Sequence, residues 1–285
     1  MIVAAAETRL KAAPELLLPV SKAPHRVIEG VTGHGYSLGM RSSDGRLIIF
    51  DGDDTLWRVE ELYDAALDRA QEFLRADGFP ADEWRIRQRE RDLENVRTMG
   101  MSRDRFPTSS EQALIDVAKR HEMQVTDSLR SAIRDESRSV FGARAPLMPG
   151  AEKTLSSLAP NFELALLTKG DESVQTKRIN DSGLVKYFAS VTIVAEKNEA
   201  VFRSLLRKTG AKRDRSWSVG NSLASDVNPA LRIGMNAIWI DAHVWEHERR
   251  EATAAKAGVV VLERLDQTPE VLLRSLTRPT RAESA

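Results

Sequence analysis

Short apolar runs alternate with helix-length polar stretches along most of this 285-residue chain. A continuous apolar run between polar segments is typical of a strand that is buried on both faces, as in a parallel sheet. Strands that alternate with helices predict an α/β fold with a doubly wound, Rossmann-like parallel sheet. The apolar runs are Leu47–Phe50, Phe162–Leu167, Val191–Val194, Trp217–Val219, Ala237–Ile240 and Val259–Leu262.

The clearest helices between these runs are predicted at Ser173–Ser182, Glu199–Lys208 and Asn228–Ile233. A glycine follows each of them, and glycine is a common helix stop because it adopts the left-handed conformation at no steric cost. In open parallel sheets, ligands bind beyond the carboxyl ends of the strands. We therefore expect the functional residues there.

One long interruption separates the first two apolar runs. Residues 58–148 show the three-four spacing of amphipathic helices, for example at Val59, Leu62 and Ala66, and show no strand-like alternation. We expect an all-helical cap that begins at the end of the first strand and therefore covers the site. The expected division is an N-terminal arm of unknown role (1–45), a core (46–57 and 149–270), the cap (58–148) and a C-terminal tail (271–285).

The overall composition excludes several classes of protein. The chain has 42 basic and 42 acidic residues, so its zero net charge argues against a nucleic-acid partner, because such proteins are usually basic. It has no cysteine, which excludes disulfides and thiolate chemistry. No apolar stretch approaches the roughly 20 residues of a membrane span, and no secretory signal is evident. A cytoplasmic location is expected.

Three carboxylates follow the first predicted strand within four residues, at Asp51, Asp53 and Asp54. Like charges so close together raise one another's pKa and destabilise a fold unless something compensates. A turn with a helix cap needs only one such residue. Three indicate a hard divalent cation such as Mg²⁺, which takes oxygen ligands.

At this point the chain resembles a known family. Asp51-x-Asp53-x-Thr55 after an apolar strand is similar to the first motif of the haloacid dehalogenase-like (HAD) hydrolase superfamily. Thr168, at the end of the second strand, resembles the second motif, and Lys197 the third. The segment from Gly220 to Asp226 resembles the acidic fourth motif. The resemblance covers about residues 46–265 and leaves out the N-terminal arm.

The resemblance implies a Mg²⁺-dependent phosphatase. Asp51 would attack phosphorus and form an aspartyl-phosphate, and Asp53 would act as general acid and base. Thr168 and Lys197 would bind the phosphoryl oxygens, whereas Lys169 faces either the substrate or solvent. The resemblance implies magnesium ligands at Asp51, the main-chain carbonyl of Asp53, Asp226 and Asn221, the last directly or through water.

One residue departs from the family pattern. The fourth motif usually has two acids, but the first of them is Asn221 here. Asparagine keeps a carbonyl oxygen and loses a negative charge, so magnesium should bind more weakly. Three alternatives stay open: a dehalogenase or a phosphomutase of the same fold, and a catalytically decayed interaction protein, of which Asn221 would be the first sign. The expected partner is a small phosphorylated metabolite, and both a monomer and a homodimer are possible.

The remaining sequence features are better explained by structural roles than by catalysis or ligand binding. His243 and His247 could share a helix face, but their charged neighbours indicate an exposed surface and not a zinc site. Gly30, Gly33 and Gly35 are interpreted as a loop or hairpin turn. The arginine-rich run Trp84–Arg91 is interpreted as a solvated, salt-bridged helix, with a substrate-binding arginine as the alternative.

Overall fold

The computed structural model describes residues 44–241 and 259–276. Within them, six parallel strands form one sheet in the order β3-β2-β1-β4-β5-β6. The predicted α/β class with a doubly wound parallel sheet is confirmed, and each strand lies within two residues of its expected position. The strands are β1 (Leu47–Phe50), β2 (Glu163–Lys169), β3 (Ser190–Val194), β4 (Trp217–Gly220), β5 (Asn236–Ile240) and β6 (Val259–Leu262).

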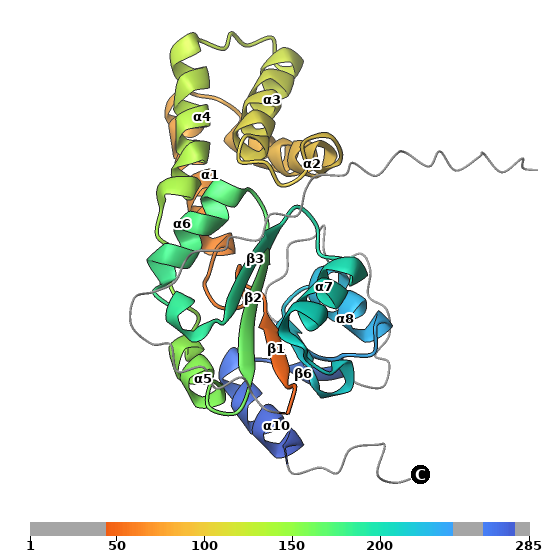
Figure 1. Cartoon of the computed structure of the whole chain (residues 1–285). Helices are drawn as coiled ribbons and strands as arrows, with labels where there is room; N and C mark the ends of the chain where they lie inside the picture. The colour runs from red at the N-terminus through yellow and green to blue at the C-terminus, as the bar shows by residue number, and fades with distance from the viewer. Residues whose placement is uncertain (1–43, 242–258, 277–285) are drawn as a thin grey trace, which may run out of the picture.

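Helices cover both faces of this sheet (Figure 1). One face packs against α5 (Ala151–Leu158), α6 (Glu172–Ser182) and α10 (Thr268–Ser275), and the other against α7 (Glu199–Thr209) and α8 (Asn228–Arg232). The helix stops expected at Gly183 and Gly210 are present, since both residues are left-handed C-caps. Crossover helices on both faces explain why the strands are apolar throughout.

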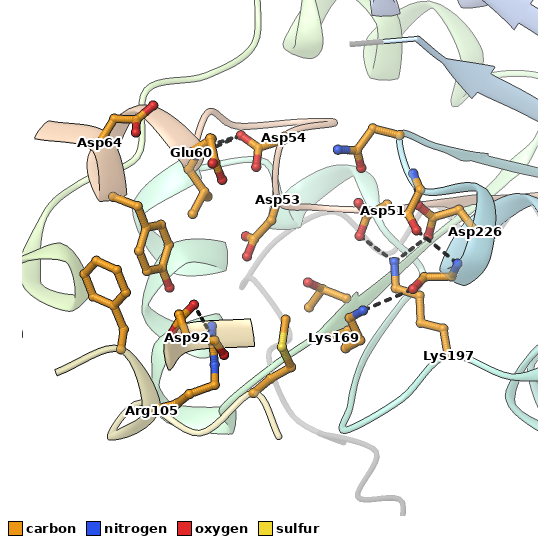
Figure 2. Close-up of a pocket in the computed structure, with 18 of the residues that line it drawn as sticks. Asp51, Asp53, Asp54, Glu60, Asp64, Asp92, Arg105, Lys169, Lys197 and Asp226 are labelled. Atoms are coloured by element: carbon orange, nitrogen blue, oxygen red, sulfur yellow. Dashed lines mark hydrogen bonds and ion pairs between the residues drawn. The ribbon is translucent and has the colours of Figure 1, made fainter. Parts of the chain in front are cut away.

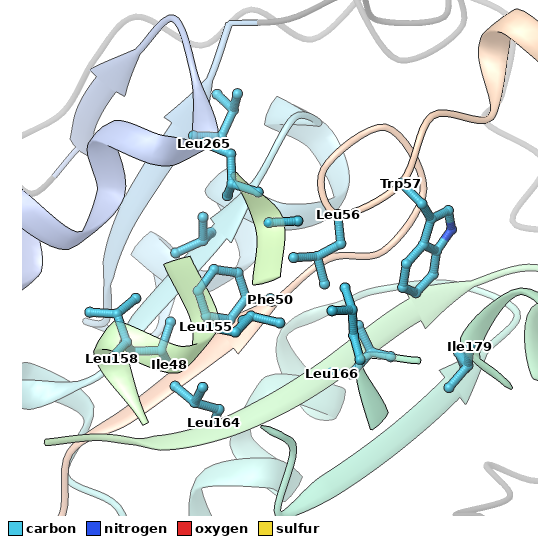
Figure 3. Close-up of a cluster of buried hydrophobic side chains, with 14 of the residues drawn as sticks. Ile48, Phe50, Leu56, Trp57, Leu155, Leu158, Leu164, Leu166, Ile179 and Leu265 are labelled. Carbon is cyan, nitrogen blue, oxygen red and sulfur yellow. The ribbon is translucent and has the colours of Figure 1, made fainter. Parts of the chain in front are cut away.

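Successive residues of β1 enter two different hydrophobic clusters. Ile48 and Phe50 pack with Leu155 of α5 on one face, as Figure 3 shows. Leu47 and Ile49 pack with Phe202 of α7 on the other. All four β1 residues are at most 1% exposed. This double burial fixes β1 in the middle of the sheet, so the loop that follows it lies at the centre of the edge.

Four further helices stand beyond the carboxyl ends of the strands (Figure 1). We call them the helical unit: α1 (Glu60–Ala76), α2 (Ala81–Met99), α3 (Arg105–Arg120) and α4 (Asp127–Gly142). The unit has its own apolar cluster, in which Trp84, Leu114 and Ile133 are fully buried. It is therefore a packed body and not a set of loops on the sheet.

The two connections of the helical unit pair with each other. The Arg58 N–H donates to the Pro146 carbonyl at 2.8 Å, and the Met148 N–H donates to the Leu56 carbonyl at 2.9 Å. Trp57 and Leu147 form an isolated antiparallel bridge between them. The chain thus leaves and re-enters the core at one place, beside the loop that carries Asp51.

One expected boundary differs from the structure. The predicted end of the core at residue 270 falls inside α10, whose Leu272 is fully buried, so the helix is not part of a free tail. The N-terminal glycines and the two histidines His243 and His247 lie outside the described residues. Over the described ranges, none of the helices combines the length and the apolar character needed to cross a bilayer.

Candidate active site

The carboxyl ends of β1, β2 and β4 bring four of the predicted site residues together. Asp51 follows β1, Thr168 lies in β2, and Asn221 and Asp226 follow β4. The Asp51 N–H donates to the Val219 carbonyl at 2.9 Å, which joins the β1 loop to the β4 end. All four residues line one cavity of about 170 Å³ between the sheet edge and the helical unit.

Lys197 joins the two central carboxylates. Its Nζ lies 2.5 Å from Asp51 Oδ1 and 2.6 Å from Asp226 Oδ1, and its side chain is 2% exposed (Figure 2). Burial alone would lower the pKa of Lys197, but the two carboxylates hold it above its ordinary value. Burial and the neighbouring Asp226 raise the pKa of Asp51, and Lys197 opposes that shift. The lysine is therefore the fixed positive charge of the site.

The position of Asp226 depends on a tight turn after β4. Leu223–Val227 form a short π-helical turn, and the Ser222 N–H donates to Asp226 Oδ2 at 3.0 Å. A Cβ on Gly220 would lie 2.2 Å from Asp226 Oδ2, so only glycine leaves room for this carboxylate. Asp226 does not cap the helix that follows, because Val227 is the N-cap of α8.

Thr55 links Asp51 to Asn221. Its buried hydroxyl lies 3.2 Å from Asp51 Oδ2 and 3.3 Å from Asn221 Oδ1. These oxygens therefore lie close together, and all belong to the hard type that Mg²⁺ prefers. Across residues 44–241 and 259–276, no group of three or more acidic or histidine side chains is arranged to hold a metal ion. A cation here would need the Asn221 or main-chain oxygens as well, and this donor set fits that requirement.

Asp53 is held by three donors. Trp57 Nε1 lies 2.7 Å from Asp53 Oδ1, and Gln175 Nε2 and Arg178 Nη1 lie 2.9 Å and 2.5 Å from Asp53 Oδ2. Arg178 is 5% exposed and also contacts Tyr63 of α1. Gln175 and Arg178 lie one turn apart on α6, so this helix fixes the carboxylate through its first two turns.

The two residues at the end of β2 line the cavity. The Thr168 hydroxyl is fully buried and donates to Gln175 Oε1 at 3.0 Å. Gln175 therefore connects Thr168 to Asp53. Lys169 lies 3.1 Å from Ser225 Oγ, so its side chain lies over the site and not in open solvent.

Asp54 does not join the central carboxylates, contrary to the expectation that all three acids of the loop converge on one cation. Its Oδ1 accepts from the N–H groups of Val59 and Glu60, at 2.7 Å and 3.1 Å, and so caps the start of α1. Burial raises the pKa of Asp54 to about 6 despite these hydrogen bonds. The backbone of Asp54 lies in the left-handed region, with a φ of 57°, a conformation that aspartate tolerates better than most residues.

The helical unit supplies the far wall of the cavity. Of its residues, the sequence points only to the arginines of the run Trp84–Arg91, through the alternative of a substrate-binding arginine, and Arg89 of that run lies in the wall. Figure 2 shows Glu60, Asp64, Asp92 and Arg105 on one side, Asp51, Lys197 and Asp226 on the other, and Asp53 between them. The available signal was helical spacing, since Glu60 and Asp64 are four residues apart and so share a helix face. The wall residues are Val59, Glu60, Tyr63, Asp64, Leu67, Gln88, Arg89, Asp92, Met101, Arg105 and Phe106.

The arginine-rich run lies in α2 and is largely salt-bridged. Arg85 pairs with Asp64 and Asp68, and Arg87 and Arg91 both pair with Asp116 of α3. These contacts agree with the prediction of a solvated, salt-bridged helix. Arg89 differs, because it is exposed and lines the cavity.

Comparison with known proteins identifies the family. A family model described as haloacid dehalogenase-like hydrolase matches residues 46–234, about two thirds of the chain. The chain belongs to the haloacid dehalogenase-like hydrolases. The resemblance seen in the four motifs is therefore confirmed, and a hydrolase is the activity class of this family.

Individual relatives are more distant. The chain is 29% identical to the pyrimidine 5'-nucleotidase YjjG of Escherichia coli over 126 residues, 42% of the chain and 55% of that relative. A haloacid dehalogenase-like family hydrolase of Xanthomonas campestris has a TM-score of 0.65 and 22% identity, covering 81% of the chain and 95% of that structure. L-2-haloacid dehalogenase of Xanthobacter autotrophicus has a TM-score of 0.53 and 17% identity, covering 81% and 99%. The structural matches show the fold alone.

Proposed function

We propose that this protein is a Mg²⁺-dependent phosphatase that hydrolyses a small phosphorylated metabolite in the cytoplasm through an aspartyl-phosphate. The observation that carries the proposal is the Lys197 bridge between Asp51 and Asp226, at the bottom of a cavity that Asp53 also lines. A carboxylate nucleophile, a fixed cation and a second carboxylate are the groups that such a reaction needs. The similarity to a nucleotidase supports a phosphate ester as substrate.

The residues divide the reaction into two displacements. An Asp51 oxygen attacks phosphorus, the bond from phosphorus to the ester oxygen breaks, and Asp53 gives its proton to the departing alkoxide. Asp53 then takes a proton from a water molecule that attacks the same phosphorus, and Asp51 departs as a carboxylate. Thr168 and Lys197 stabilise the negative charge on the phosphoryl oxygens. Gln175 and Arg178 hold Asp53 between these steps.

The second carboxylate favours a phosphatase over a dehalogenase. Halide is a weak base and departs without a proton, so a dehalogenase has no need for an acid at the position of Asp53. An alkoxide is a strong base, and proton donation to it is typically worth about 10²–10⁴-fold in rate. Trp57, Gln175 and Arg178 hold the Asp53 carboxylate at the cavity, where the phosphatase reaction requires an acid and base.

The donor set fits magnesium. Asp51, Asp226, Asn221 and the main-chain carbonyl of Asp53 would hold the ion, and one lysine does not neutralise the two buried carboxylates. When bound, Mg²⁺ neutralises charge on the phosphate and lets a dianion approach a carboxylate. Asn221 supplies an oxygen without a charge, which favours a moderate affinity.

Hydrolysis of p-nitrophenyl phosphate by the full chain tests the proposal. The wild type should release p-nitrophenol when about 5 mM MgCl₂ is present. Asp51→Asn should lower kcat by at least about 10³-fold, because the amide is not a nucleophile. Acid-quenched Asp53→Asn should retain phosphate on Asp51. Turnover by Asp51→Asn at the wild-type rate would exclude the aspartyl-phosphate. Halide release from 2-chloropropionate would instead favour a dehalogenase.

Removal of the metal tests the cofactor. EDTA should abolish turnover and added Mg²⁺ should restore it. Asn221→Asp should lower the Mg²⁺ concentration for half-maximal activity several-fold, because it adds a charged oxygen beside Asp51. Full activity in EDTA would contradict the magnesium assignment, and inactivity of the wild type that Asn221→Asp restores would support a decayed site.

A further inference from the structure

The wall of the cavity formed by α2 contains two polar atoms without partners. Gln88 is 2% exposed and Asp92 is 7% exposed, and both line the cavity. Over residues 44–241 and 259–276, Gln88 Nε2 and Asp92 Oδ1 make no hydrogen bond. The other Asp92 oxygen is paired with Arg105. A buried polar group without a partner is unfavourable, so a ligand that satisfies both atoms binds more tightly than one that leaves them unpaired.

The two side chains can contact one ligand together. They are four residues apart on α2, so they lie on the same helix face with Cβ atoms about 5–6 Å apart. Gln88 offers an N–H donor and Asp92 offers an acceptor. A ligand that meets both must carry an acceptor and a donor side by side. A carbonyl next to an N–H, as in the lactam edge of a heterocyclic ring, has that arrangement.

The neighbouring surface favours a flat group. Tyr63, Leu67, Met101 and Phe106 line the same cavity, and the rings of Tyr63 and Phe106 meet edge to face with their centroids 4.8 Å apart. Planar rings pack well on such aromatic surfaces. Glu60 and Asp64 also line the cavity (Figure 2), but Asp64 is paired with Arg85 and the exposed Arg89 lines the same cavity, so these charges do not decide for or against a second anionic group.

We propose that Gln88 and Asp92 select the leaving group, and that it is a heterocyclic nucleoside-like alcohol whose lactam edge bonds to both residues. This inference rests on the proposed phosphatase function, because it names the alcohol that the phosphatase releases. Gln88 donates to the ring carbonyl, and Asp92 Oδ1 accepts from the adjacent N–H. Phosphate esters of small carboxylic acids lack this edge and are poor substrates at this site.

Binding of the alcohol alone separates the two proposals, because it needs no turnover. Uridine, which has a lactam edge, should give saturation-transfer NMR signals with the wild type and with Asp51→Asn. Those signals should be lost with Gln88→Met. Glycerol and glycolate should give none with any form. Equal uridine signals from the wild type and Gln88→Met would overturn the inference whether or not the protein is a phosphatase, and glycerol binding that needs Gln88 would replace the lactam by a diol.

Turnover provides the second measurement. Relative to p-nitrophenyl phosphate, kcat/KM for uridine 5'-monophosphate should fall about fivefold or more in Gln88→Met, the usual effect of one lost hydrogen bond. Asp92→Asn should act in the same direction, and the exposed Glu90→Gln on the same helix should leave the ratio unchanged. Phosphoglycolate should be at least about tenfold poorer than uridine 5'-monophosphate. An unchanged ratio in Gln88→Met would overturn the inference.

Thermal unfolding distinguishes recognition from a structural role. If Gln88 serves the ligand, Gln88→Met removes an unpaired buried amide, so the melting temperature of the unliganded protein should stay the same or rise. A structural hydrogen bond would make the same variant melt several degrees lower, and that result would count against the inference. Gln88→Met is the main test variant, because Asp92→Asn would also weaken the salt bridge between Asp92 and Arg105.

Discussion

Glu60 begins α1 at the edge of the cavity and is surrounded by other acids. Burial, followed by the charges of Asp54 and Asp64, raises its pKa from 4.5 to about 7, although Arg89 opposes the shift. The folded protein therefore keeps the Glu60 proton at pH values where the unfolded chain has lost it. Stability falls as pH rises from about 4.5 to about 7 and stays lower above that range.

We expect Glu60→Gln to remove this pH dependence. The variant should match the wild type at pH 4.5 and be more stable at pH 8, by at most about 3 kcal/mol. Urea denaturation in EDTA at both pH values measures the difference. The neighbouring exposed Glu61→Gln is the control and should show no such gain. A gain of the same size at both pH values would mean that Glu60 acts through packing instead of through its charge.

At the scale of elements, the β4 end and the turn after it fit together because of one glycine. Gly220→Ala places a methyl group against the Asp226 carboxylate, which is itself held by Lys197 and the Ser222 N–H. We expect loss of about 1–3 kcal/mol of stability and at least about 10²-fold lower turnover, because Asp226 must move. Urea denaturation and the p-nitrophenyl phosphate assay measure both effects.

Gly142→Ala is a matched control. This glycine ends α4, its backbone is not left-handed, and a Cβ there would meet nothing within 4 Å. Alanine should leave turnover unchanged and stabilise the helix by up to about 1 kcal/mol. Full activity in Gly220→Ala would show that the turn after β4 tolerates a displaced Asp226.

The strands could be predicted from the sequence more reliably than the helix α2 that lines the cavity. Leu47–Phe50 is buried on both faces, so its apolar run is unambiguous, and the family motifs follow from the strand ends. The wall formed by α2 could not be predicted, because that helix has few apolar positions and its charged run resembles a solvated surface. Gln88 and Asp92 become buried only because α2 packs on α3 and the helical unit stands over the sheet. Tertiary packing decides this, and local spacing does not.

At the scale of the molecule, separate apolar clusters belong to the sheet and to the helical unit. Trp84 is fully buried in the unit, and its Nε1 donates to the Ser110 carbonyl at 3.0 Å. We expect Trp84→Ala to destabilise the unit by about 3–5 kcal/mol and to leave the sheet folded at urea concentrations that unfold the helices.

Two spectroscopic probes can separate these events. Far-UV circular dichroism senses the helices, and fluorescence of Trp84→Ala senses the four remaining tryptophans. Of these, Trp57, Trp217 and Trp239 lie in or beside the sheet, and Trp245 lies outside the described residues. The dichroism transition should precede the fluorescence transition in the variant. Ile86→Ala, at a 65% exposed position of the same helix, is the control and should unfold like the wild type. Coincident transitions in Trp84→Ala would show that the two bodies unfold as one.

The paired connections of the helical unit have a consequence for how such a protein can change over time. Because Arg58 and Pro146 are hydrogen-bonded neighbours, the chain segment between them leaves the core and returns to it at the same place. A segment of another length, or another set of helices, could be exchanged at that point without moving β1 or α5. The sheet edge with Asp51 and Lys197 would keep its chemistry, while the part that meets the rest of the substrate is replaced.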